Sequence, residues 1–72
     1  MDKTYGYLEI LGAKIRRARC GRGLTQAEFA RLIGLDDSAI SRIENGKREN
    51  LSVAAIRKIS KELGIDIAQL ME

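Results

Sequence analysis

The sequence contains no His and only one Cys, and these two shortages argue against the commonest kinds of catalytic site. A catalytic thiol needs a neighbouring base, and no His is present to serve Cys20 in that way. The sequence also has no cluster of metal ligands and no Gly-rich loop that could cradle a phosphate. We therefore expect a protein that is not an enzyme, with no catalytic residue, no metal site and no cofactor.

The single Cys, the polar start and the lack of a long apolar run indicate where the protein resides. One Cys cannot form an intrachain disulfide, which fits a reducing compartment. The start MDKTYGYLEI has no basic segment followed by an apolar one, so it does not resemble a signal peptide. No apolar run approaches the ~20 residues that span a bilayer. We expect a soluble, cytoplasmic protein with no membrane partner.

Pro is absent as well, and aromatic residues make up only 4% of the chain. No alternating run of β-branched residues is long enough to predict a sheet, whereas 32% charged residues without Pro favour a compact helical domain. A chain of 72 residues has room for one domain with a small core. Such a domain buries about 60% of its unfolded surface, so a partner subunit would add stability.

Positive charge is concentrated in one part of the chain. The net charge is +3 overall, but the stretch from Ala13 to Arg31 contains six basic residues and only one acidic residue, Glu28. A basic block on folded helices suits a polyanion, although an ordinary solvated helix surface has the same composition. The basic residues are Lys14, Arg16, Arg17, Arg19, Arg22 and Arg31.

Four helix starts share one local pattern: an apolar residue, a capping residue, and a second apolar residue four positions after the cap. This hydrophobic staple fixes the angle at which the chain enters a helix. Thr25 with Glu28, and Asp66 with Gln69, add the residues of a capping box. The starts are Leu24-Thr25…Phe29, Leu35-Asp36…Ile40, Leu51-Ser52…Ile56 and Ile65-Asp66…Leu70, and the Gly residues at the helix ends are Gly34, Gly46 and Gly64.

With an amphipathic stretch that ends at Gly21, these signals predict an all-α domain of five helices. Residues 1–7 are expected to form a flexible arm and residues 8–72 a single domain. The last helix has more apolar surface than closing the core requires, which favours packing of the last two helices on a second subunit. The predicted helices span about 8–20, 25–33, 36–45, 52–63 and 66–71.

The stretch from Leu24 to Lys47 organises the rest of the chain. It predicts two short amphipathic helices that are separated at Gly34. A helix that buries Ile40 and Ile43 must present four nearby polar residues on its other side. This pattern predicts that the second helix enters the major groove of DNA. The polar residues are Ser38, Ser41, Arg42 and Asn45.

Four short motifs lie on the predicted helices: LGxxIRxxR from Leu11, GLTQxxxA from Gly23, ISRIENGK from Ile40 and LGIDxxxL from Leu63. By these motifs the sequence resembles the phage-repressor and Cro-like helix-turn-helix family, also called the xenobiotic-response-element type. The resemblance implies a five-helix, lambda-repressor-like domain that binds operator DNA, usually as a dimer, with its third helix in the major groove. The loop after Gly46 departs from the family, because it lacks a Pro near Asn50 and is one residue longer.

Four residues of the third predicted helix are expected to contact bases, because the N-terminal part of a recognition helix points into the groove. Ser38 and Ser41 can each donate or accept a hydrogen bond, and Arg42 can bond to guanine O6 and N7. Asp37 stands where the family often has Gln or Arg. Its carboxylate can accept from cytosine N4 or can simply favour the helix N-terminus, and we prefer the second interpretation.

Further residues are expected to contact DNA phosphates. The start of the second helix offers N–H groups and a partial positive charge, which suit a phosphate. The resemblance implies that Gln26 both binds phosphate and braces the third helix. The loop after Gly46 is expected to follow the sugar-phosphate backbone. The phosphate candidates are Thr25, Gln26, Asn45, Lys47 and Arg48, together with Lys14 or Arg16 from the first helix.

Two pairings are expected to fix the third helix in place. Arg19 and Glu44 each flank the apolar stripe of their helix, and the resemblance implies an ion pair between them that locks the third helix to the first. Ala30 is small at the position where the second and third helices must approach closely, so a larger side chain should force them apart. The position of the third predicted helix is therefore expected to depend on residues outside that helix.

Two functions compete. The first is a sequence-specific transcriptional regulator, of repressor or controller type, that binds a near-palindromic operator as a homodimer in a bacterial or phage cytoplasm, with no small-molecule effector. The alternative is a protein-interaction module with weak or no DNA binding, such as an antitoxin or another partner-binding helix-turn-helix domain. Asp37 and the near-neutral C-terminal half support the alternative, whereas the basic block and Lys47-Arg48 oppose it.

Overall fold

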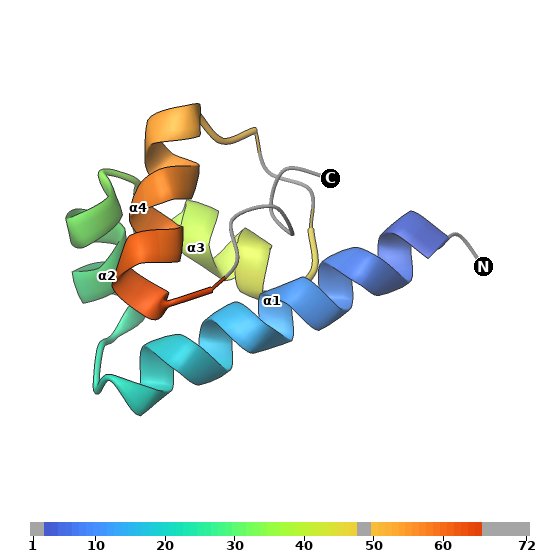
Figure 1. Cartoon of the computed structure of the whole chain (residues 1–72), viewed down its shortest axis with the longest axis horizontal. Coiled ribbons are helices and arrows are strands. Elements are labelled where there is room, and N and C mark those ends of the chain that lie inside the picture. Colours follow the sequence, from blue (N-terminus) through green and yellow to red (C-terminus); the bar gives the residue numbers. More distant parts are fainter. Residues whose placement is uncertain (1–2, 48–49, 66–72) are drawn as a thin grey trace.

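The fold is described from a computed structural model that covers residues 3–47 and 50–65. In this part of the chain every element is a helix and none is a strand, so the all-α prediction is confirmed there. α1 runs along one side of the molecule, and the three shorter helices pack across it (Figure 1). No helix in these ranges is both long and apolar enough to cross a membrane. The helices are α1 (Lys3–Gly21), α2 (Gln26–Ile33), α3 (Asp37–Glu44) and α4 (Val53–Leu63).

The capping residues predicted from the sequence begin α2, α3 and α4. The Thr25 hydroxyl accepts from the Glu28 N–H at 3.0 Å, and the Glu28 carboxylate accepts from the Thr25 N–H at 2.8 Å, which completes a capping box. Asp36 and Ser52 each accept a hydrogen bond from the backbone three residues further on. A good cap contributes about 1 kcal/mol, so the local sequence is sufficient to fix where these helices begin.

Gly34 ends α2 in the left-handed conformation, with a φ of 86°. A residue with a Cβ is strained there, so Gly permits the sharp turn between α2 and α3. The N–H groups of Gly34 and Leu35 both donate to the carbonyl oxygen of Ala30, which satisfies the last turn of α2. Three residues, 34–36, therefore suffice to join the two helices.

α1 begins at Lys3 rather than at Leu8, which corrects the predicted arm at residues 3–7. These residues are helical, and the half-buried Tyr7 packs against the hydrophobic core. Extending a helix costs little once its nucleus has formed, and Tyr7 adds apolar contacts to the extra turn. Residues 1–2 of the predicted arm lie outside the described residues.

The predicted fifth helix at residues 66–71, with its staple and capping box, also lies outside the described residues. The part of the chain that the structure describes contains four helices, so the predicted count of five is not supported. Each of these four helices contributes one of the largest fully buried side chains. These side chains are Ile15 of α1, Phe29 of α2, Ile40 of α3 and Ile59 of α4. The core is therefore complete only when all four helices are present.

α1 and α3 meet backbone to backbone at Gly12. A Cβ at this position would lie 2.4 Å from the carbonyl oxygen of Ile43 and 2.8 Å from that of Glu44, which is too close for any side chain. A second close approach follows the end of α3, where a Cβ on Gly46 would lie 2.9 Å from the Cα of Glu9. α1 therefore holds both the last turn of α3 and the turn that comes after it.

Candidate nucleic-acid interface

α3 has a buried side and an exposed side. Ile40 is fully buried and Ile43 is 8% exposed. The other side carries polar side chains spaced three or four residues apart, so they stand one above another on a single face of the helix. This row, which we call the polar stripe, consists of the half-buried Ser41 and the exposed Ser38, Arg42 and Asn45.

Two carboxylates lie at the start of α3, next to Ser38. Asp36 accepts a hydrogen bond from the Ala39 N–H at 2.8 Å and another from the Ser38 hydroxyl at 2.9 Å. These bonds, the one from Ala39 most strongly, lower the pKa of Asp36, so its carboxylate is ionised at neutral pH. Asp37 is exposed in the first turn, where a negative charge interacts favourably with the helix dipole. That position is compatible with either predicted role of Asp37.

Asn45 ties the far end of the polar stripe to α3. Its side-chain amide donates to the carbonyl oxygen of Ser41 at 2.9 Å, and its backbone N–H donates to the same oxygen at 3.0 Å. One of the last carbonyl groups of the helix is thereby satisfied. Asn45, a predicted phosphate contact, thus also acts as the C-cap of α3.

Glu44 connects three helices from the buried side of α3. Its carboxylate accepts hydrogen bonds from Nε of Arg19 at 2.5 Å and from Nη2 of Arg19 at 3.0 Å. A third comes from the side-chain amide of Gln26, at 3.1 Å, in the first turn of α2. Arg19 also donates from Nη1 to the carbonyl oxygen of Leu24 at 2.6 Å. The structure thus brings together Arg19, Gln26 and Glu44, which we call the Glu44 cluster.

The Glu44 cluster is charged but faces inward. The side chains of Arg19 and Glu44 are only 9% and 2% exposed. The hydrogen bond to Glu44 raises the pKa of Arg19 above its already high ordinary value, so the guanidinium stays ionised. The two parallel hydrogen bonds of an Arg–carboxylate pair also require a specific relative orientation of the two groups. Because Glu44 neutralises Arg19 within the fold, Arg19 adds little to the attraction for a polyanion, whereas the other basic residues of the block are exposed.

The start of α2 lies beside the Glu44 cluster. The capping box engages the N–H groups of Thr25 and Glu28, whereas those of Gln26 and Ala27 have no acceptor within the helix. Such N–H groups, together with the positive end of the helix dipole, favour a phosphate. Thr25 and Gln26 are therefore located at a helix end that suits a phosphate, and Gln26 also braces α3 through Glu44.

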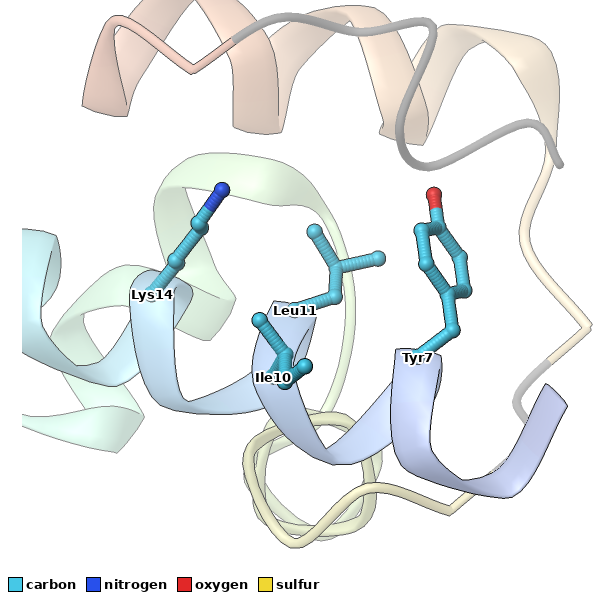
Figure 2. A pocket seen from close by; sticks show the side chains of 4 residues that line it. All are labelled: Tyr7, Ile10, Leu11 and Lys14. Atoms are coloured by element: carbon cyan, nitrogen blue, oxygen red, sulfur yellow. The ribbon is translucent and has the colours of Figure 1, made fainter. Parts of the chain in front are cut away.

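The two phosphate candidates on α1 lie on different sides of that helix. Arg16 is four residues after Gly12, so it stands on the side of α1 that approaches α3. Lys14 instead lines a hollow together with Tyr7 and Ile10. Figure 2 shows Lys14 and Tyr7 extending from α1 in the same direction. By helical spacing, Arg16 and not Lys14 is therefore on the α3 side of α1.

Lys47 begins the loop that follows α3. It is exposed, and its backbone N–H donates to the carbonyl oxygen of Arg42 at 2.9 Å. This hydrogen bond fixes the first residue of the loop close to the end of the polar stripe. The other phosphate candidate in the loop, Arg48, lies outside the described residues.

Two features of the site were not predictable from the motifs. The first is the backbone contact at Gly12, for which the only signal is a Gly inside an amphipathic helix, where Gly is otherwise unfavourable. The second is the bond between Asp36 and Ser38, because Asp36 was predicted only as a cap. Asp and Ser side chains often form such local bonds near helix starts, so the spacing of two residues is a weak signal.

α2, the turn at Gly34 and α3 together have the arrangement of a helix-turn-helix, and comparison with known proteins agrees. The profile described as "Helix-turn-helix" matches residues 15–70. The chain belongs to the helix-turn-helix family. The resemblance found in the motifs is therefore confirmed for most of the chain.

Relatives of this helix-turn-helix protein include both controllers and repressors. It is 43% identical over 60 residues to the control protein C.MunI of Mycoplasma sp, a match that covers 82% of this chain and 80% of the relative. It is 39% identical over 64 residues to the HTH-type transcriptional repressor RghR of Bacillus subtilis (strain 168), covering 89% of this chain but 47% of RghR. The chain thus spans most of C.MunI and about half of RghR.

A solved structure shows the same fold. The restriction-modification controller protein C.AhdI from Aeromonas hydrophila superposes on this helix-turn-helix protein with a TM-score of 0.76 at 35% sequence identity. The superposition covers 96% of this chain and 99% of C.AhdI. The arrangement of helices around α3 is therefore shared with a protein that is described as a controller.

Proposed function

We propose that this chain is a sequence-specific transcriptional regulator that binds a near-palindromic DNA operator as a homodimer, with α3 in the major groove. The observation that carries the proposal is the contrast between the two sides of α3. The Glu44 cluster and Gly12 hold one side against α1 and α2, and the polar stripe covers the other. A firmly held helix with several outward hydrogen-bonding groups suits direct reading of base edges.

The residues divide into two groups in this proposal. Ser38, Ser41 and Arg42 contact base edges, with Arg42 forked onto guanine O6 and N7. Asp37 mainly favours the N-terminus of α3. The phosphate contacts carry no sequence information, but they set the orientation of the protein on the duplex. They are Thr25, Gln26, Arg16, Asn45, Lys47 and Arg48, without Lys14, which lies on the other side of α1.

The size of the domain supports dimerisation, and the groove geometry predicts the spacing of the half-sites. A 72-residue domain has a small core, and packing of α4 and the segment after it on a second subunit would add to that core. Two recognition helices related by a twofold axis require half-sites centred about 34 Å apart, one turn of DNA. The similarity to two controller proteins over most of their length supports a regulatory role for this domain.

The proposal is tested by titrating labelled DNA from upstream of the protein's own gene at several salt concentrations. Phosphate neutralisation predicts that log K falls with log salt by about 0.9 per contacted phosphate. Specific binding should exceed binding to random DNA of the same length by about 10³-fold or more. Footprinting and sedimentation of the complex then report half-site spacing and the number of bound chains. No preference over random DNA at any salt would contradict the proposal.

A second candidate, a protein-interaction module with weak DNA binding, is favoured by one feature of α1. Ile10 is 62% exposed and lines a hollow with Ala13, Lys14 and Arg17. A large apolar side chain flanked by two cations suits an acidic segment of a partner protein. A reporter on the protein's own promoter separates the candidates. Arg42→Ala should weaken regulation if the protein acts through DNA, whereas Ile10→Glu should weaken it if the protein acts through this partner.

A further inference from the structure

We infer that Asp36 fixes the hydrogen-bonding direction of Ser38, so that the first turn of α3 selects a base that presents an amine, cytosine or adenine, over guanine or thymine. This inference rests on the proposed function, because it requires α3 to enter the major groove. It goes beyond that function by naming the class of base that one position of each half-site must hold.

The first step is the bond between Asp36 and Ser38. Oγ of Ser38 lies 2.9 Å from Oδ1 of Asp36, and the same oxygen accepts the Ala39 N–H at 2.8 Å. Both contacts favour the ionised carboxylate and lower the pKa of Asp36. An ionised carboxylate can only accept hydrogen bonds. The hydrogen shared by the two side chains must therefore come from Ser38.

The second step is the effect on the outward surface of Ser38. A Ser hydroxyl has one hydrogen and two acceptor lone pairs, so an unconstrained Ser can bond to either kind of base edge. When its hydrogen is bound to Asp36, only the lone pairs of Ser38 can face a base. Turning the hydroxyl toward an acceptor would break a bond to a charged group, which is the stronger kind. Asp36 thus converts an ambiguous residue into an acceptor.

The third step is to match this acceptor with the base edges of the major groove. Cytosine N4 and adenine N6 are amine donors there, whereas guanine and thymine present only acceptors. The neighbouring Asp37 is exposed and, as a carboxylate, is also an acceptor. Arg42, one turn further along α3, carries only donors. The half-site should therefore present an amine to the first turn of α3 and guanine acceptors to Arg42.

The experiment selects bound sequences from a random DNA pool with the full chain and three variants. The wild-type protein should select cytosine or adenine at one position of each half-site. Replacing that base by 2-pyrimidinone or purine, which lack the amine, should weaken wild-type binding about fivefold to tenfold. Ser38→Ala should bind the site with the amine and the site without it nearly equally, because the acceptor that Asp36 orients is gone.

Asp36→Ser is the informative variant, because Ser also caps helices well and so preserves α3. It removes the charged acceptor, so that at most a neutral hydroxyl holds the hydrogen of Ser38, and guanine and thymine should then be accepted at the same position. Ser52→Asp is the matched control, since it makes the reverse exchange at the N-cap of α4. That control should leave base preferences unchanged. Circular dichroism and urea unfolding check that each variant is folded.

The possible outcomes distinguish failure of this inference from failure of the proposed function on which it rests. If the wild type selects no sequence at all, the proposed function and the inference both fail. If it selects a sequence, but removing the amine has no effect on wild-type binding, the inference alone fails. The inference also fails if folded Asp36→Ser retains the wild-type preference. Should Asp36→Ser not fold, the comparison of wild type with Ser38→Ala on the two forms of the site still decides it.

Discussion

The two sides of α3 use polar residues in opposite ways. On the buried side, Glu44 accepts three hydrogen bonds from residues of α1 and α2. On the exposed side, Ser38 bonds to the N-cap of its own helix, and Asn45 bonds to the last turn. The buried bonds therefore determine where α3 stands, whereas the exposed bonds determine which hydrogen-bonding groups it presents. Changes on the buried side should alter stability, and changes on the exposed side should alter binding.

The largest effect is expected from Glu44→Ala. This change leaves the buried guanidinium of Arg19 without its carboxylate, which typically costs about 3–5 kcal/mol. Since small domains have a free energy of unfolding of about 5–15 kcal/mol, much of the stability should be lost in urea denaturation. A double-mutant cycle with Arg19→Ala measures the pair itself. A coupling energy of zero would show that the ion pair does not hold α3.

Gly12→Ala should have the next largest effect on stability. The added Cβ would lie 2.4 Å from the carbonyl oxygen of Ile43, and this backbone atom cannot move without shifting α3. Overpacking of this kind costs about 1–3 kcal/mol in the free energy of unfolding. Gly6→Ala in the same helix is the control, because nothing lies within 4 Å of its Cβ, and it should stabilise the protein slightly. Equal effects at both positions would contradict the close approach.

Arg42→Ala should lower the free energy of unfolding by no more than about 1 kcal/mol, because interactions of exposed charged side chains contribute little, and it should remove discrimination at one base pair, worth about 1–3 kcal/mol. Competition between the operator and its single-base variants measures this loss. Lys47→Ala is the comparison, because losing a phosphate contact should weaken binding to all sequences alike. If Arg42→Ala instead weakens all sequences equally, the polar stripe does not read bases through Arg42.

The smallest effect is expected from removing one cation of α1. Arg16→Ala should lower the slope of log K against log salt by about one unit, because Arg16 stands on the α3 side of α1. Lys14→Ala removes the same charge from the other side of the helix and should leave the slope unchanged. A lower slope for Lys14→Ala alone would reverse the assignment of the two sides.

Much of the fold was predictable from short stretches of sequence. Thr25, Asp36 and Ser52 cap α2, α3 and α4 where the staple pattern predicted, and Gly34 makes the predicted turn. The start of α1 was predicted wrongly, because residues 3–7 were interpreted as a polar arm, whereas they are helical and Tyr7 packs against the core. Local signals thus succeeded where hydrogen bonds are local and failed where a tertiary contact extends a helix.

The candidate site was predictable only in part. The polar stripe follows from the spacing of apolar residues along α3, and the structure shows those residues buried. Gln26 was expected to brace the third helix, and it does so by donating to Glu44. The different sides occupied by Lys14 and Arg16 were not predicted, because charge patterns do not say which flank of a helix faces a neighbour. The bond from Ser38 to Asp36 was also missed, although both residues lie in one local segment.

Local sequence patterns were enough to predict where α2, α3 and α4 begin and end, and which residues of α3 face outward. These properties depend on caps, turns and helical periodicity, all of which act over a few residues. The way in which α3 is held depends instead on contacts between distant parts of the chain. The Glu44 cluster joins residues 18 and 25 positions apart in the chain, and the contact at Gly12 requires two backbones to meet. Such contacts form only once packing has brought distant segments together, so no local pattern specifies them.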